Sequence, residues 1–257
     1  MTRGNLAEKP IYIEMLGPSG VGKTTVANLV AADLVEWRVL YRGGLKNREW
    51  QNLFAALRSW KRLRRFIKFY YYLRNHRNVP RQLARRRAAA VTGIPVPRPF
   101  IRRGSCALVV EEGPVGYLSS CGGFGEPWKE WVEVLLPEGL EVQAFFIMLT
   151  ASPEELERRR AKRGRPDKVR TLMKGTEGLP EEMQHRGKQY WLSQLTASGA
   201  FCKDIITDSR SAEDIAQEVC AFVRNCLLAA DGSSGGLASR EKFASLQPLV
   251  ARGLGCR

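Results

Sequence analysis

The chain lacks the features that mark membrane-spanning, zinc-binding or disulfide-bonded proteins. Its long apolar runs, such as residues 144–149, are far too short to cross a bilayer. It has only two histidines, and its six cysteines are scattered with no Cys-x-x-Cys pair, so a structural zinc site is not expected. No apolar signal-peptide core follows Met1. We therefore expect buried, reduced thiols in a cytoplasmic protein.

Acidic residues are absent from one long stretch. Between Gln51 and Val110 there is no Asp or Glu, whereas fifteen Arg and Lys residues lie there. These fifteen equal the whole net charge of +15, because the rest of the chain is electrically balanced. Such a one-sided field favours an anionic partner, and residues 50–103 are expected to contact an anionic small molecule, an anionic membrane surface or nucleic acid. The alternative is a solvated basic helix face whose aromatic residues belong to the core.

A complete phosphate-binding loop is the most informative motif. Residues 17–24 match the pattern G-x-x-x-x-G-K-[ST], between an apolar run at 11–16 and a helical pattern at 24–37. In such a loop the backbone N–H groups face one phosphate, Lys23 reaches the β- and γ-phosphates, and Thr24 ligates Mg²⁺. The sequence therefore predicts nucleoside-triphosphate binding by Gly17, Pro18, Ser19, Gly20, Val21, Gly22, Lys23, Thr24 and Thr25.

Apolar runs alternate with helical patterns along the rest of the chain. Further strands are expected at 38–41, 106–110, 142–149 and 204–207. Helices are expected at 47–73, 81–91, 127–136, 153–165, 180–195 and 212–230. Five buried strands that alternate with helices predict an α/β fold with a parallel, doubly wound sheet. Ligands of such sheets bind beyond the carboxyl ends of the strands, where the phosphate loop and Glu111-Glu112 would meet.

The sequence leaves open the roles of the two glutamates that follow the third strand, Glu111 and Glu112. One of them could hold Mg²⁺, and the other could accept a proton from a substrate hydroxyl. An acceptor that is already an ionised phosphate would need no base. An exposed acidic turn is the third reading, so the sequence does not assign either Glu111 or Glu112 a role.

Residues 152–165 directly follow an apolar strand and are rich in arginine. This segment resembles the lid-forming segment of the nucleoside monophosphate kinase superfamily, thymidylate kinases in particular, because Arg159 and Arg163 have that family's spacing. Residues 207–214 look like the family's last strand–helix unit. The resemblance covers about residues 10–42 and 106–228.

The resemblance implies a three-layer P-loop fold with a five-stranded parallel sheet and an arginine-rich lid, and the pattern of this sequence adds a basic helical insertion. It also implies ATP with Mg²⁺, and lid arginines that bridge the oxygens of the transferring phosphoryl group. The kinase-like domain would span 10–228, with an acceptor region at 45–105 and a lid at 158–178, followed by a linker and tail at 229–257. The candidate catalytic residues are Lys23, Glu111, Glu112, Arg159, Arg163 and Arg165. Thr24 and Glu111 are the candidate metal ligands, and the candidate acceptor contacts are Arg42, Arg62 and Arg85.

The acceptor itself cannot be carried over from the family. The Asp-Arg pair that thymidylate kinases carry after the third strand is missing, and residues 45–105 match no part of the family. We expect transfer of the γ-phosphoryl group of ATP to an anionic, phosphorylated, nucleotide-like small molecule. A kinase of a hydroxyl acceptor (sugar, antibiotic, nucleoside or lipid head group) is the alternative, as is a non-enzymatic nucleotide-dependent protein on membrane or nucleic acid. The sequence also leaves open whether the protein forms a homodimer.

Overall fold

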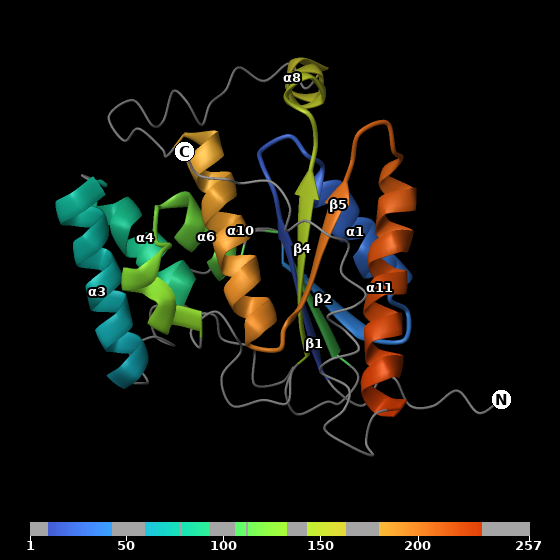
Figure 1. Cartoon of the computed structure of the whole chain (residues 1–257), viewed down its shortest axis with the longest axis horizontal. Helices are drawn as coiled ribbons and strands as arrows, with labels where there is room; N and C mark the ends of the chain where they lie inside the picture. The colour runs from blue at the N-terminus through green and yellow to red at the C-terminus, as the bar shows by residue number, and fades with distance from the viewer. Residues whose placement is uncertain are drawn as a thin grey trace, which may run out of the picture.

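The chain forms one parallel β-sheet with helices on both faces (Figure 1). The computed structural model describes residues 10–42, 60–77, 79–92, 106–111, 113–132, 143–162 and 180–232. The sheet has the strand order β2-β3-β1-β4-β5, and every pairing in it is parallel. Its strands are β1 (Ile11–Leu16), β2 (Arg38–Arg42), β3 (Cys106–Val110), β4 (Gln143–Thr150) and β5 (Phe201–Ile206). The predicted α/β class and parallel sheet are therefore confirmed.

The described helices, apart from α8, form two layers, one on each face of the sheet. They are α1 (Lys23–Asp33), α3 (Trp60–Arg77), α4 (Arg81–Thr92), α6 (Pro114–Ser120), α8 (Pro153–Lys162), α10 (Glu181–Ala197) and α11 (Ala212–Gly232). On one face α1 packs against α11, and on the other α10 contacts α6, α6 contacts α4, and α4 contacts α3. The shorter α8 follows β4 at the carboxyl edge of the sheet (Figure 1).

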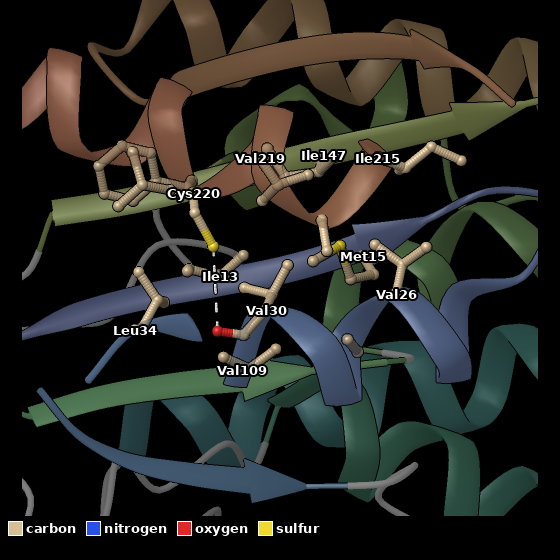
Figure 2. Close-up of a cluster of buried hydrophobic side chains, with 14 of the residues drawn as sticks. Ile13, Met15, Val26, Val30, Leu34, Val109, Ile147, Ile215, Val219 and Cys220 are labelled. Atoms are coloured by element: carbon tan, nitrogen blue, oxygen red, sulfur yellow. Dashed lines mark hydrogen bonds between the residues drawn. The ribbon is translucent and has the colours of Figure 1, made fainter. Parts of the chain in front are cut away.

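The central strand β1 is buried along its whole length and divides the core into two clusters. Ile13 and Met15 pack with Val26 and Val30 of α1 and with Val219 of α11, as Figure 2 shows. The even-numbered residues of β1 point to the other face, because successive side chains of a strand alternate. A strand buried on both faces reads as a continuous apolar run, and this is why 11–16 was predictable from the sequence.

Aromatic side chains dominate the second cluster, on the face of α3, α4, α6 and α10. Phe69 of α3 lies with its ring centroid 5.6 Å from those of both Trp128 and Trp131. These two tryptophans belong to a short 3₁₀ helix, η2 (Glu126–Trp131), in which residues three apart share one face. The indole N–H of Trp191 in α10 donates to the Gly123 carbonyl oxygen at 2.8 Å and joins this loop to α10.

On this face one helix was not predicted and one expectation was wrong. The sequence assigned no helix to residues 114–120, which form α6, and this helix begins at Pro114, a residue suited to a first helical turn. At 126–131 the expected helix is a 3₁₀ helix, which places both tryptophans against Phe69, and residues 133–140 lie outside the described part.

Smaller differences concern the ends of elements. Strand β5 begins at Phe201 rather than 204, because the Phe201 ring stacks on Phe145 of β4 with 5.0 Å between centroids. Helix α3 continues past residue 73 to Arg77, while residues 43–59 are not described. Helix α11 runs to Gly232, past the domain boundary expected at 228. Among the described helices, none is both long and apolar enough to cross a membrane.

Four cysteines whose side chains the structure describes are free thiols, namely Cys121, Cys202, Cys220 and Cys226. Burial raises the pKa of Cys202 to about 11 and that of Cys220 to about 12. At neutral pH these thiols are protonated, so they serve as packing groups rather than nucleophiles.

Candidate functional site

The phosphate loop connects the carboxyl end of the central strand β1 to the first turn of α1. Gly17 has a φ of +140°, and a Cβ at this position would collide with the carbonyl oxygen of Leu149. Gly20 has a φ of +96°, in the left-handed region that glycine adopts without strain. The loop therefore needs glycine at these positions to curl tightly against β4.

Lys23 lies at the start of α1 and reaches back across the loop. Its Nζ donates to the carbonyl oxygens of Gly17 at 3.0 Å and Pro18 at 2.9 Å. These two carbonyls hold the ammonium group beside the loop's backbone. The position suits a cation that contacts the phosphates of a bound nucleotide.

Thr24 and Glu111 come together although they are 87 residues apart in the sequence. The Thr24 hydroxyl donates to the Oε1 atom of Glu111, which follows strand β3 beside β1. A hydroxyl and a carboxylate oxygen suit Mg²⁺, which takes few protein ligands and completes its shell with water and substrate phosphates. In the described ranges no group of three or more His, Cys, Asp or Glu could hold a metal. Thr24 and Glu111 are thus a fitting pair of ligands for a nucleotide-bound Mg²⁺.

Two consecutive arginines of α8, the helix that follows the carboxyl end of β4, donate hydrogen bonds to the phosphate loop. Arg159 donates to the Val21 carbonyl oxygen at 3.0 Å and to the Thr207 carbonyl oxygen at 2.7 Å. Arg160 donates twice to the carbonyl oxygen of Ser19, at 3.0 and 2.9 Å. The sequence singled out Arg159 but not Arg160, since the lid spacing gives no role to its neighbour. Together the two guanidinium groups place α8 over the loop.

Glu155 holds Arg159, and its neighbour Arg158, in place. It accepts hydrogen bonds from Arg158 and from Arg159, the latter at 2.6 Å. These bonds, the one from Arg158 first, lower the pKa of Glu155 to about 2. The carboxylate therefore stays ionised at neutral pH and orients the guanidinium of Arg159 toward the loop.

Lys188 of α10 is a fourth cation at the loop, and the sequence reasoning missed it. Its Nζ donates to the carbonyl oxygen of Gly17 at 2.9 Å, and only 5% of the residue is exposed. A signal did exist in the sequence: Lys188 shares the apolar stripe of Trp191, Leu192 and Leu195 at helical spacing. A lysine on a core-facing stripe must meet a polar partner there, and this one meets the phosphate loop.

Glu14, a buried acid on β1, was also missed. It is fully buried, and its carboxylate accepts hydrogen bonds from the Tyr12 hydroxyl at 2.9 Å and the Gly116 N–H at 3.0 Å. Burial raises the pKa of Glu14 to about 7. Because Gly116 belongs to the first turn of α6, Glu14 fixes the segment that directly follows Glu111.

The remaining predicted residues are not brought to the loop by contacts that the structure describes. Arg85 lies in α4, which packs against α3 and α6. Arg42 ends β2 and Arg62 lies in α3, but their side chains are outside the described part. Glu112, Arg163, Arg165 and the lid from 163 to 178 are also outside it. Their roles stay predictions.

Comparisons with known proteins give structural matches only. No protein-family model matches the chain, and no curated protein matches its sequence. Among solved structures, thymidylate kinase from Ehrlichia chaffeensis is similar with 14% identity and a TM-score of 0.43, over 84% of this chain and 99% of that one. The YorR protein from Bacillus subtilis, in complex with phosphorylated GDP, is similar with 12% identity and a TM-score of 0.38, over 82% of this chain and 95% of that one.

Proposed function

We propose that the chain is an ATP-dependent phosphotransferase that moves the γ-phosphoryl group onto an anionic, phosphorylated, nucleotide-like small molecule. One observation carries the proposal. Four cations from three helices, Lys23, Arg159, Arg160 and Lys188, donate to carbonyl oxygens of a single phosphate-binding loop. Cations gathered at one phosphate-binding loop suit phosphoryl transfer, which uses cationic donors to stabilise the charge on the transferring group.

The reaction breaks the bond between the γ-phosphorus and its bridging oxygen, and an acceptor oxygen forms a new bond to the same phosphorus. ADP leaves with the bridging oxygen. Negative charge spreads over the oxygens of the transferring group, where ammonium and guanidinium donors stabilise it. When bound, Mg²⁺ at Thr24 and Glu111 would neutralise charge on the β- and γ-phosphates.

The position of Lys188 supports an anionic acceptor. Helix α10 lies on the same face of the sheet as α3, α4 and α6, opposite α1 and α11. Lys188 therefore brings positive charge to the loop from the side that carries the basic helices. Because Glu111 accepts a hydrogen bond from the Thr24 hydroxyl, it suits a metal ligand better than a base for a hydroxyl acceptor.

The proposal is tested by ADP release from ATP and Mg²⁺ against a panel of nucleoside monophosphates, sugar phosphates, nucleosides, sugars and lipid head groups. We expect release to depend on a phosphorylated acceptor, and mass spectrometry to find that acceptor with one more phosphate. If only unphosphorylated acceptors increase ADP release, the protein is a kinase of hydroxyl acceptors instead. Release that no acceptor increases would refute a kinase.

Replacement of Glu111 by glutamine is expected to raise the Mg²⁺ concentration needed for half-maximal turnover. The amide keeps the shape of the side chain but removes the charge that Mg²⁺ prefers. The measurement is turnover against Mg²⁺ concentration. Glu126→Gln is the matched control, since the Glu126 side chain is 84% exposed and lies in η2. If turnover depends on Mg²⁺ concentration in the same way for Glu111→Gln and wild type, Glu111 is not a metal ligand.

Replacement of Lys188 by methionine is expected to lower kcat/KM on the order of tenfold, because a hydrogen bond from a charged group is lost at the loop. Methionine keeps the apolar stem of the lysine, so α10 should pack as before. Steady-state kinetics with thermal melting measures both effects. Lys188→Arg, which keeps the charge, should retain more activity than Lys188→Met. Equal losses in the two variants would speak for a packing role.

A further inference from the structure

The outer side of α3 carries an exposed stripe that the phosphate site does not use. Six of its exposed side chains fall within about 120° of arc at 3.6 residues per turn. They are Trp60, Arg64, Ile67, Lys68, Tyr71 and Arg74. We call these residues the α3 stripe.

Three large apolar or aromatic side chains form the middle of the α3 stripe. Trp60 is 76% exposed, Ile67 is 42% exposed and Tyr71 is 58% exposed. The opposite side of the same helix is anchored, because Phe69 and Leu73 are fully buried in the aromatic cluster. Two cations of the α3 stripe also contact the protein: the Nζ of Lys68 lies 5.7 Å from the centroid of the Trp128 ring, and Arg74 donates to the Val79 carbonyl oxygen at 2.9 Å. The three apolar or aromatic side chains stay largely exposed although α3 is packed. A contiguous exposed apolar patch rimmed by polar residues marks an interaction surface.

Charge selects the kind of partner. Arg64 and Lys68 lie on one flank of the apolar residues and Arg74 on the other, and neither α3 nor α4 contains an acidic residue. A symmetric dimer through this face would set the same cationic patch against itself. The partner must therefore be negatively charged.

Shape and side-chain chemistry favour a lipid surface over nucleic acid. Base stacking uses aromatic rings, and the aliphatic Ile67 in the middle of the α3 stripe offers no ring. Tryptophan and tyrosine place their apolar bodies at the membrane interface, while flanking Lys and Arg reach lipid phosphates. We propose that the α3 stripe docks the protein on an anionic lipid bilayer, with α3 parallel to the surface. This proposal does not depend on the phosphotransferase activity.

The test measures binding of the full chain to vesicles by co-sedimentation. Vesicles of phosphatidylcholine alone are compared with vesicles that contain about 30% phosphatidylserine, at low and high salt. We expect binding to the anionic vesicles only, weakening as salt rises. Emission from Trp60 should shift to shorter wavelength on binding, and Trp60→Phe should abolish that shift, because the other described tryptophans are at most 6% exposed.

Two variants separate the contributions to binding. Arg64→Gln with Lys68→Gln should weaken binding roughly 25-fold at low salt, about fivefold for each cation. Trp60→Ser with Ile67→Ser and Tyr71→Ser should weaken it on the order of tenfold at every salt concentration. The matched control is Val35→Ser with Leu228→Ser, which removes apolar side chains that are 81% and 53% exposed outside α3. It should bind as wild type does.

Four results would overturn the proposal. The first two are no binding to anionic vesicles at low salt, and wild-type binding to these vesicles by the triple serine variant. The third is that the wild type binds a single-stranded oligonucleotide and the triple variant loses this binding but still binds vesicles. The fourth is that the wild type sediments as a dimer and the triple variant as a monomer. Circular dichroism confirms that each variant is folded. If the triple variant does not fold, the proposal is decided by comparing the emission shift on vesicle binding between wild type and Trp60→Phe.

Discussion

Replacement of Lys23 by alanine is expected to lower the rate of phosphoryl transfer by a factor on the order of 10²–10³ while the protein stays folded. The ammonium group is held at 3.0 and 2.9 Å from the carbonyl oxygens of Gly17 and Pro18. In the proposed reaction, an ammonium group at that position stabilises charge that develops on the transferring phosphoryl group. The shape of the loop depends instead on the backbone of its glycines, so the loss should not unfold the protein.

The measurement is kcat with saturating ATP and acceptor, together with thermal melting of both proteins. Lys129→Ala is the matched control, because the Lys129 side chain is 61% exposed and makes an exposed ion pair with Glu126 at 3.9 Å. This control should turn over as wild type does. Near-normal turnover by folded Lys23→Ala would show that the loop around Lys23 is not the catalytic phosphate site.

A second large effect concerns stability and pH. Burial raises the pKa of Glu14 from 4.5 to about 7. Between these values folded Glu14 keeps its proton while the unfolded carboxyl loses it, so the unfolded state binds fewer protons. The stability that Glu14 contributes is complete below pH 4.5 and falls as pH rises to about 7. Each pH unit costs about 1.4 kcal/mol, and the total is about 3 kcal/mol in the free energy of unfolding.

Replacement of Glu14 by glutamine should remove this pH dependence. The amide oxygen can still accept from the Gly116 N–H, but the side chain no longer ionises. Relative to wild type, the variant should therefore gain about 3 kcal/mol in stability between about pH 4 and about pH 8. Denaturant unfolding of both proteins over this range measures the gain, and Glu126→Gln, whose side chain is 84% exposed, is the control. Parallel curves for Glu14→Gln and wild type would contradict the assignment of Glu14 as a protonated buried acid.

The sequence predicted the parts of the fold that depend on neighbouring residues. Strands β3 and β4 are nearly continuous apolar runs, and β1 is such a run interrupted only by Glu14, because all three are buried on both faces; runs of this kind are visible without any structure. The phosphate loop was equally predictable, because its glycines, Lys23 and Thr24 act within eight consecutive residues. Helix α6 was not predicted, since it is a short helix whose Gly116 N–H pairs with Glu14 on another element.

Glu111 shows where local reasoning ends. The sequence placed it beyond a strand but left metal ligand, base and exposed turn open. Only the parallel pairing of β1 with β3 brings its carboxylate to the Thr24 hydroxyl, and this contact favours the metal. The sequence could not decide because side-chain partners across a sheet depend on strand order and register.

The sequence by itself thus determined the α/β class, the phosphate loop and the concentration of positive charge between Gln51 and Val110. Only the tertiary structure decided which cations reach the loop. Lys188 contacts Gly17 across 171 residues, and Arg160 contacts Ser19 across 141. Motifs record groups that act within a few residues, whereas a site at the carboxyl edge of a parallel sheet gathers its groups from the ends of distant strands and helices. For that reason the phosphate-loop motif was visible in the sequence, and the set of cations that contact the loop was not.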